Sequence, residues 1–237
     1  MKYILIVLMI VSLTVQANGQ FREYPQLPNN AQSLNDFIVD GWKLMDNARG
    51  DLNKDGVEDI AFVLQSRDSI PAEDEASHWS IPDYPRIMGI AFWDGETNSY
   101  RLEVQSNEFV ITQGGNGAME EPFKGVWIGK GTLSFDFGYW SSAGTWYTGT
   151  SAYIFRYQNK RFELIGQELT SLHRATHATT EISINYSMRK AIYFSQESEE
   201  DRGVSKTVSF EVDELPTFKT IGAAEFNPAV EINWDSN

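Results

Sequence analysis

Oxygen-bearing side chains recur at alternate positions in one short segment of the sequence. Counted from Asp51, they fall at positions 1, 3, 5 and 9, which are Asp51, Asn53, Asp55 and Asp59. Calcium takes about six to eight hard oxygen ligands, and a tightly wound loop can turn alternate side chains towards one ion. Gly56 at position 6 permits the sharp turn that this requires. The spacing therefore predicts a calcium site.

The backbone carbonyl of Val57, at position 7, is the fifth predicted ligand, because the same winding would turn it towards the ion. An EF-hand would add a glutamate at position 12, but that residue is Phe62. The unbroken apolar run of residues 60–64 also indicates a buried strand, where an EF-hand has a helix. We predict a weak structural site; a plain polar turn is the alternative, because Asn and Asp-Gly favour turns unaided.

A second candidate feature is a cluster of aromatic side chains around a turn of small residues. Its members are Tyr139, Trp140, Trp146 and Tyr147. Exposed rings could stack on sugars or anchor a protein partner, whereas buried rings would simply form the core of a hairpin. Because aromatic residues dominate protein cores, burial is the interpretation that we favour.

Other residue patterns indicate no specific chemistry. His173 and His177 are four residues apart, as zinc ligands on a helix can be, but the Ser- and Thr-rich residues 171–180 favour a polar loop. The 33 acidic residues offer too many carboxylate pairs to single out a catalytic one. We assign no catalytic residue and no organic cofactor, and whether the chain is an enzyme stays open, with the balance against it.

The N-terminal residues have the composition of an export signal. Residues 1–17 combine an early positive charge, an apolar run of about twelve residues and small residues before the expected cleavage point, with cleavage after residue 19 as the alternative. Such a run is too short to span a bilayer. The chain has no cysteine, so neither a lipid anchor nor a disulfide is expected. We predict a periplasmic or secreted protein without a membrane anchor.

The charge and length limit the partners and the domain count. A formal net charge of −14 repels phosphate backbones and anionic lipids, so nucleic acid and membrane surfaces are disfavoured partners. Cleavage would leave roughly 220 residues, which suits a single domain. The sequence does not indicate an oligomeric state.

The periodicity of the mature chain is that of strands. Residues 18–32 are expected to form an extended arm, and residues 33–39 one short helix with Ser33 as its N-cap. About ten strands separated by Gly-, Asn- and Asp-rich turns follow, with Glu163 on the outward face of its strand. Residues 33–237 are therefore predicted to form one antiparallel all-β domain, propeller-like or sandwich-like. The long acidic segment 66–85 could be a functional lid or a disordered loop.

The aspartate loop resembles that of FG-GAP and VCBS-type repeats, which joins strands in integrin-like β-propellers. In those repeats the positions that match Asp51, Asn53, Asp55, Val57 and Asp59 coordinate calcium, so the resemblance implies the same ligands here. Propellers repeat the loop, whereas this chain has one. Most of the mature chain is also similar to a group of exported bacterial proteins, a resemblance that implies no activity. The shared motifs are Gly41-Trp42, the loop itself, Pro122-Phe123, Phe155 to Tyr157, Phe162 to Gly166 and Asn185-Tyr186. The chain departs from the group at Ser187-Met188-Arg189, where the group tends to have Leu-Thr-Gly.

These features predict an exported, non-catalytic binding module with a structural calcium ion, whose ligand is a glycan or another exported protein. One alternative is a hydrolase whose acidic catalytic residues are scattered along the chain. Another is a periplasmic inhibitor or immunity protein whose acidic surface faces a basic target. An exposed aromatic strip would favour the binding module, and a deep cleft with two carboxylates of perturbed pKa would favour the hydrolase.

Overall fold

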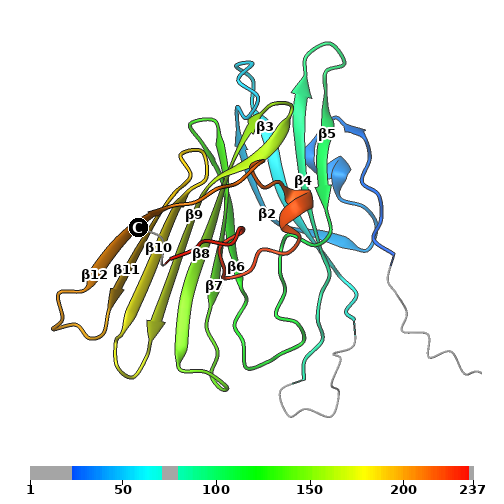
Figure 1. Cartoon of the computed structure of the whole chain (residues 1–237). Helices are drawn as coiled ribbons and strands as arrows, with labels where there is room; N and C mark the ends of the chain where they lie inside the picture. Colours follow the sequence, from blue (N-terminus) through cyan, green and yellow to red (C-terminus); the bar gives the residue numbers. More distant parts are fainter. Residues whose placement is uncertain (1–22, 71–79, 235–237) are drawn as a thin grey trace, which may run out of the picture.

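The computed structural model describes residues 23–70 and 80–234 and shows a nearly all-β protein with two antiparallel sheets (Figure 1). The two sheets share one core, so the described part of the chain is sandwich-like and has no propeller blades. The predicted signal segment, residues 1–17 with either cleavage point, lies outside the described residues, as does the centre of the long acidic segment. In the described part, neither helix is long and apolar enough to cross a membrane.

The first sheet has five strands in the order β1-β5-β4-β3-β2. Strands β2 to β5 form a meander, and the N-terminal arm adds β1 beside β5. The strands are β1 (Asn30–Ala31), β2 (Trp42–Gly50), β3 (Asp59–Ser66), β4 (Arg86–Asp94) and β5 (Ser99–Ser106).

The second sheet is a meander of seven strands in the order β12-β11-β10-β9-β8-β7-β6, and its edge strand β6 lies beside β2 of the first sheet. About ten strands were predicted and the described residues form twelve; the predicted buried strand of residues 60–64 falls within β3. The strands are β6 (Phe123–Gly129), β7 (Thr132–Tyr139), β8 (Tyr147–Gln158), β9 (Arg161–His173), β10 (Thr179–Asn185), β11 (Lys190–Gln196) and β12 (Val204–Ser209).

The helix predicted over residues 33–39 is a single 3-10 turn, η1 (Leu34–Phe37). The backbone N–H of Ser33 donates to the carboxylate of Asp36 at 2.8 Å, so the predicted capping pair forms. Leu34 and Phe37 are buried against the five-stranded sheet. The element is shorter than predicted because the backbone is already extended at Ile38, with φ −82° and ψ 97°.

Strand β3 is buried on both faces, which explains its unbroken apolar sequence. Ala61 and Val63 face the core that the two sheets share. Ile60, Phe62 and Leu64 face a second cluster beneath the N-terminal arm and η1. The five-stranded sheet is therefore a middle layer, covered on one side by the arm and on the other by the seven-stranded sheet.

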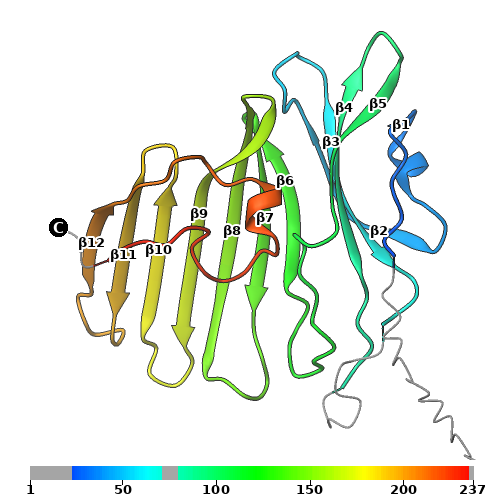
Figure 2. The ribbon, with the colours of Figure 1, turned by 45° about the vertical axis from the view of Figure 1, so that its right-hand side comes forward.

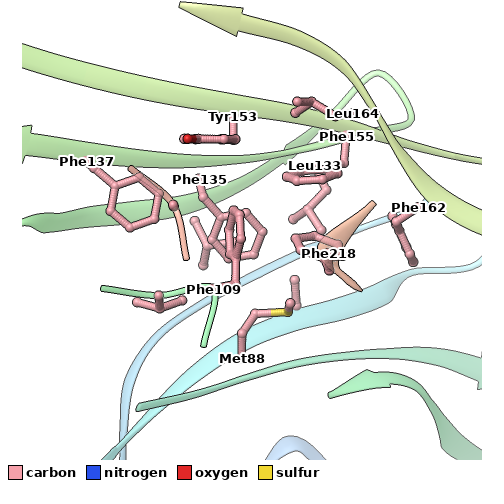
Figure 3. Close-up of a cluster of buried hydrophobic side chains, with 14 of the residues drawn as sticks. Met88, Phe109, Leu133, Phe135, Phe137, Tyr153, Phe155, Phe162, Leu164 and Phe218 are labelled. Carbon is pink, nitrogen blue, oxygen red and sulfur yellow. The ribbon is translucent and has the colours of Figure 1, made fainter. Parts of the chain in front are cut away.

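The main core lies between the two sheets and is rich in aromatic rings (Figure 3). Phe109, in the segment after β5, has its ring centroid 5.1 Å from that of Phe135 and 4.9 Å from that of Phe218, both edge to face. Phe218 belongs to the one-turn helix α1 (Phe218–Ile221) and stacks on Phe155 at 4.0 Å. Edge-to-face and offset contacts of this kind add to the stabilisation from burial alone.

The residues after β12 run across the inner face of the seven-stranded sheet (Figure 2). Tyr153 donates its hydroxyl to the carbonyl of Glu225 at 2.7 Å, and Gln167 donates to the carbonyl of Asn227 at 2.8 Å. The hydroxyl of Tyr186 donates to Gln167 at 2.6 Å. Burial raises the pKa of Tyr153 to about 12. This C-terminal segment, residues 210–234, therefore satisfies the polar groups of the inner face with its own backbone.

Glu163 alternates with the core residues Phe162 and Leu164, which places it on the outer face of its strand as predicted, but there it is buried and not exposed. Its carboxylate accepts hydrogen bonds from Gln158 at 2.6 Å and from Arg161 at 2.7 Å. Burial alone would raise the pKa of this carboxyl, but these bonds and those from Asn159 hold it below its ordinary value. The isolated bridge between Glu163 and Thr217 shows the reason, because the C-terminal segment covers this end of β9.

Candidate functional site

The aspartate loop, residues 51–59, connects β2 to β3 and is wound by two residues of positive φ. Lys54 has φ 67° and Gly56 has φ 88°. The carboxylate of Asp51 accepts the backbone N–H of Lys54 at 2.6 Å on one oxygen and that of Gly56 at 3.0 Å on the other. The first predicted ligand thus closes the turn by binding the backbone that follows it.

The next three predicted ligands lie together at the tip of the loop. The side chain of Asn53 accepts the backbone N–H of Asp55 and donates to the carboxylate of Asp55, both at 2.9 Å. The backbone N–H of Val57 donates to Asp55 at 2.8 Å. Asp55 and Val57 are exposed, and Asn53 is half-buried. The tip is a series of turns in which each side chain fixes the next peptide.

Asp59 is fully buried, unlike the other predicted ligands. One oxygen of its carboxylate accepts the backbone N–H groups of Leu52 at 2.8 Å and Asn53 at 3.3 Å, and the other accepts that of Trp93 at 3.1 Å. Burial raises the pKa of this carboxyl, although the three hydrogen bonds lower it in part. Asp59 therefore ties the loop to β4 of the same sheet.

The donor set of the loop is chemically suited to calcium, because it consists of carboxylate and amide oxygens. A carboxylate oxygen that accepts one N–H keeps a second lone pair for a cation. Within the described residues, however, no three His, Cys, Asp or Glu side chains are gathered closely enough to hold a metal ion. Asn53 and Asp55 are in contact, whereas Asp51 and Asp59 are each engaged with backbone N–H groups. To coordinate one calcium ion, the carboxylates of Asp51, Asp55 and Asp59 have to move closer to one another.

The loop rests on the hairpin that joins β6 to β7, at the junction of the two sheets. A Cβ atom on Gly50 would lie 2.5 Å from the Cγ2 atom of Ile128, and one on Gly131 would lie 3.5 Å from the Cε atom of Lys54. The absence of a side chain at Gly50 allows this close approach, whereas a Cβ on Gly131 would make an ordinary van der Waals contact. The β6–β7 hairpin of the second sheet therefore supports the loop.

The aromatic cluster lies at the opposite end of the molecule, at the turn between β7 and β8 (Figure 2). Trp146 is 65% exposed, Tyr147 is 53% exposed and Trp140 is 37% exposed, whereas Tyr139 is half-buried against Phe226. The predicted hairpin core is therefore wrong for three of the four rings. Trp140 and Trp146 lie beyond Tyr139 and Gly149, the last paired residues of the β7–β8 ladder.

Two residues at the end of β9 complete this cluster, and the sequence did not single them out as ligand-binding. The ring of His173 lies 4.9 Å from that of Tyr147, measured between centroids. The guanidinium carbon of Arg174 lies 5.4 Å from the centroid of the Trp140 ring. His177 does not join His173 in a metal site, because it is exposed and pairs with Glu199 at 2.8 Å.

Of the aromatic and basic side chains at this end of the molecule, Trp146 and Arg174 line an open hollow of about 470 Å³. That volume falls within the usual range for small-ligand sites. The lining offers an indole ring, a guanidinium and hydroxyl groups, a combination that can stack on a ring and donate hydrogen bonds. The lining residues are Ser142, Ala143, Gly144, Thr145, Trp146 and Arg174.

Two aspartates in the described part of the chain have raised pKa values, and neither lines the hollow. Asp59 is enclosed under the aspartate loop. Asp136 lies on β7, where burial raises its pKa and a hydrogen bond from Trp127 lowers it in part. The hollow thus contains no pair of perturbed carboxylates of the kind that glycoside hydrolysis uses.

Comparison of the chain with protein-family models, with curated proteins and with solved structures finds no significant match.

Proposed function

We propose that this chain is an exported, non-catalytic binding module that holds a glycan or another exported protein at the aromatic hollow. The observation that carries the proposal is the exposure of Trp140, Trp146 and Tyr147 at one end of the molecule, where Trp146 lines a concave surface. Soluble proteins seldom leave three large aromatic rings exposed at one place without a partner for them. Tryptophan and tyrosine are also the residues that most often dominate binding energies.

The aspartate loop supports the module, in this proposal, as a structural calcium site with Asp51, Asn53, Asp55, Asp59 and the carbonyl of Val57 as ligands. Its oxygen donors suit calcium, and its position at the junction of the sheets suits a clamp. We expect a dissociation constant of roughly 10⁻⁴ to 10⁻³ M, as in extracellular modules. Such an affinity fits a periplasmic or secreted location, where calcium is abundant enough to fill the loop.

The binding function is tested by measuring affinity for a glycan panel and for purified exported proteins. The wild-type chain is expected to bind at least one of these without converting it, and Trp146→Ala to weaken that binding at least tenfold. Trp127→Ala is the matched control, because Trp127 is 59% exposed but lies on β6, outside the hollow. Equal losses in the two variants, or turnover of a bound glycan, would contradict the proposal.

The calcium site is tested by titrating calcium into chelator-treated protein in a calorimeter and recording the melting temperature. At about ten times the dissociation constant, calcium is expected to stabilise the fold by about 1.4 kcal/mol. Asp55→Ala should abolish the response. Glu58→Gln is the control, because Glu58 is an exposed acidic residue of the same loop but is not a predicted ligand. A response that survives Asp55→Ala would place the ion elsewhere.

A further inference from the structure

Arg174 is a half-buried cation that the protein holds in place with neutral groups only. Its backbone N–H donates to the carbonyl of Trp146 at 2.8 Å, and Nη2 donates to the carbonyl of Thr145. Its guanidinium lies over the ring of Trp140. Nε is buried without a hydrogen-bond partner. In the part of the chain that the structure describes, Arg174 takes part in no ion pair.

Arg174 shares this lack of an ion pair with other described arginines, such as Arg67 and Arg189, but differs from them in lining the hollow. Arg86, Arg101 and Arg161 each pair with a glutamate, in a chain with 33 acidic and 19 basic residues. None of the residues that line the hollow is acidic, and the carboxylate of Glu199 is bound to His177. A cation that is partly removed from water attracts an anion more strongly than a fully solvated one. The hollow therefore presents a local positive charge on an acidic protein.

We infer that the hollow selects carbohydrates that carry a carboxylate, with Arg174 binding the carboxylate and the ring of Trp146 stacking on the sugar. The inference rests on the proposed binding function and names the ligand class for the same site. A guanidinium can bind a carboxylate through two parallel hydrogen bonds, and the guanidinium of Arg174 lies over the ring of Trp140. The exposed indole supplies an apolar face beside this charge.

The shape of the site favours a sugar over a protein surface as the occupant. The hollow is concave and of about 470 Å³, which is the size of a small-ligand site, whereas protein interfaces are broad and need about 800 Å² from each partner. The turn that forms the hollow, residues 141–145, consists of small residues, so a ring can approach its backbone. A carboxylated sugar residue satisfies the shape, the aromatic face and the charge together.

The experiment compares an oligogalacturonate with its methyl-esterified form by calorimetry, at low and at high salt. We expect the esterified form, which has lost the charge, to bind at least tenfold more weakly, and binding of the acidic form to weaken with salt. Arg174→Gln should bring the two affinities to within about threefold of each other, because it removes the charge. Arg174→Lys should give an intermediate preference, because it keeps the charge but not the planar fork.

Melting temperatures establish that each variant is folded, and Trp127→Ala should leave the preference unchanged. Equal affinity for the two forms in the wild-type chain would overturn the inference, while Trp146-dependent binding of either form would leave the proposed function intact. Binding of neither form would also overturn it. Trp146-dependent binding of a neutral glycan or of an exported protein would then show that the module binds but that its ligand class is different. The lack of any Trp146-dependent ligand would overturn both proposals.

Discussion

The two ends of the molecule differ in whether their functional groups have partners. In the aspartate loop, Asp51, Asp55 and Asp59 accept hydrogen bonds from nearby backbone N–H groups. In the aromatic hollow, Trp146 is open to solvent and the charge of Arg174 has no counter-ion within the described residues. A group that is already paired stabilises the fold, whereas a group without a partner can contribute binding energy to a ligand.

This difference in pairing predicts that one end of the molecule determines stability and the other determines ligand affinity. The loop lies at the junction of the two sheets and should control unfolding, with or without calcium. The hollow lies beyond the end of the β7–β8 ladder and should control affinity, with little effect on unfolding. Changes at the two ends should therefore be independent of each other, as expected for distant sites without shared contacts.

The largest effect on stability is expected for Asp59→Ala in calcium-free buffer. The substitution leaves the backbone N–H groups of Leu52, Asn53 and Trp93 without their acceptor, in a position closed to water. We expect a loss of about 3 kcal/mol in the free energy of unfolding, because buried donors without partners cost about 1–3 kcal/mol each and part of the loop can relax. Urea unfolding in the presence of a chelator measures the loss.

Asp55→Ala provides the matched control for this substitution. Asp55 is an aspartate of the same loop, but it is exposed and its partners can bind water instead. Its replacement should cost below about 1 kcal/mol without calcium. If the two variants lost equal stability in chelator, the inward hydrogen bonds of Asp59 would not be what holds the loop.

The aspartate loop was easier to predict from the sequence than the hollow. All the candidate ligands of the loop lie within nine residues, so their spacing alone indicated a turn and its oxygen donors. The hollow joins the β7–β8 turn to Arg174 at the end of β9, and no local pattern marks Arg174. Whether Trp146 is buried depends on how far the covering segments reach, which is a property of the whole fold.

The strands were predictable because their apolar runs are short, periodic and bounded by turn residues. Residues 60–64 show this most directly, since β3 is buried on both faces and every one of them is apolar. The C-terminal segment was not predictable, because it packs without a regular period and uses backbone carbonyls such as that of Glu225. The same C-terminal segment also covers Glu163, through the bridge between Thr217 and Glu163.

Substitution of one glycine at each end tests whether the two ends are independent. The expected loss of stability lies between that of Asp59→Ala and that of Trp146→Ala. Gly56 in the loop has φ 88° and Gly144 in the hollow has φ 86°, and an added Cβ would meet nothing within 4 Å at either one. Alanine should therefore cost each turn about 1 kcal/mol through backbone strain alone. Gly56→Ala is expected to weaken the calcium response and spare glycan affinity, and Gly144→Ala to do the reverse.

Calorimetric titration of both ligands into both variants gives four measurements for this comparison. The calcium affinity of Gly56→Ala and the glycan affinity of Gly144→Ala should fall. The other two affinities should stay within about twofold of the wild-type values. A loss of glycan affinity in Gly56→Ala would show that the ends are coupled through the sheets, which the distance between them along the strands does not lead us to expect.

The smallest effect is expected for the stability of Trp146→Ala. With 65% of the side chain already in water, its removal exposes little further apolar surface, and the free energy of unfolding should change by less than about 0.5 kcal/mol. Trp127→Ala should cost more although Trp127 is 59% exposed, because its ring packs on Gly125 and donates to Asp136. Urea unfolding measures the loss in free energy of unfolding for each variant and shows which loss is larger. A loss above about 1 kcal/mol in Trp146→Ala would mean that the ring supports the fold, and its exposure could then no longer be attributed to a ligand.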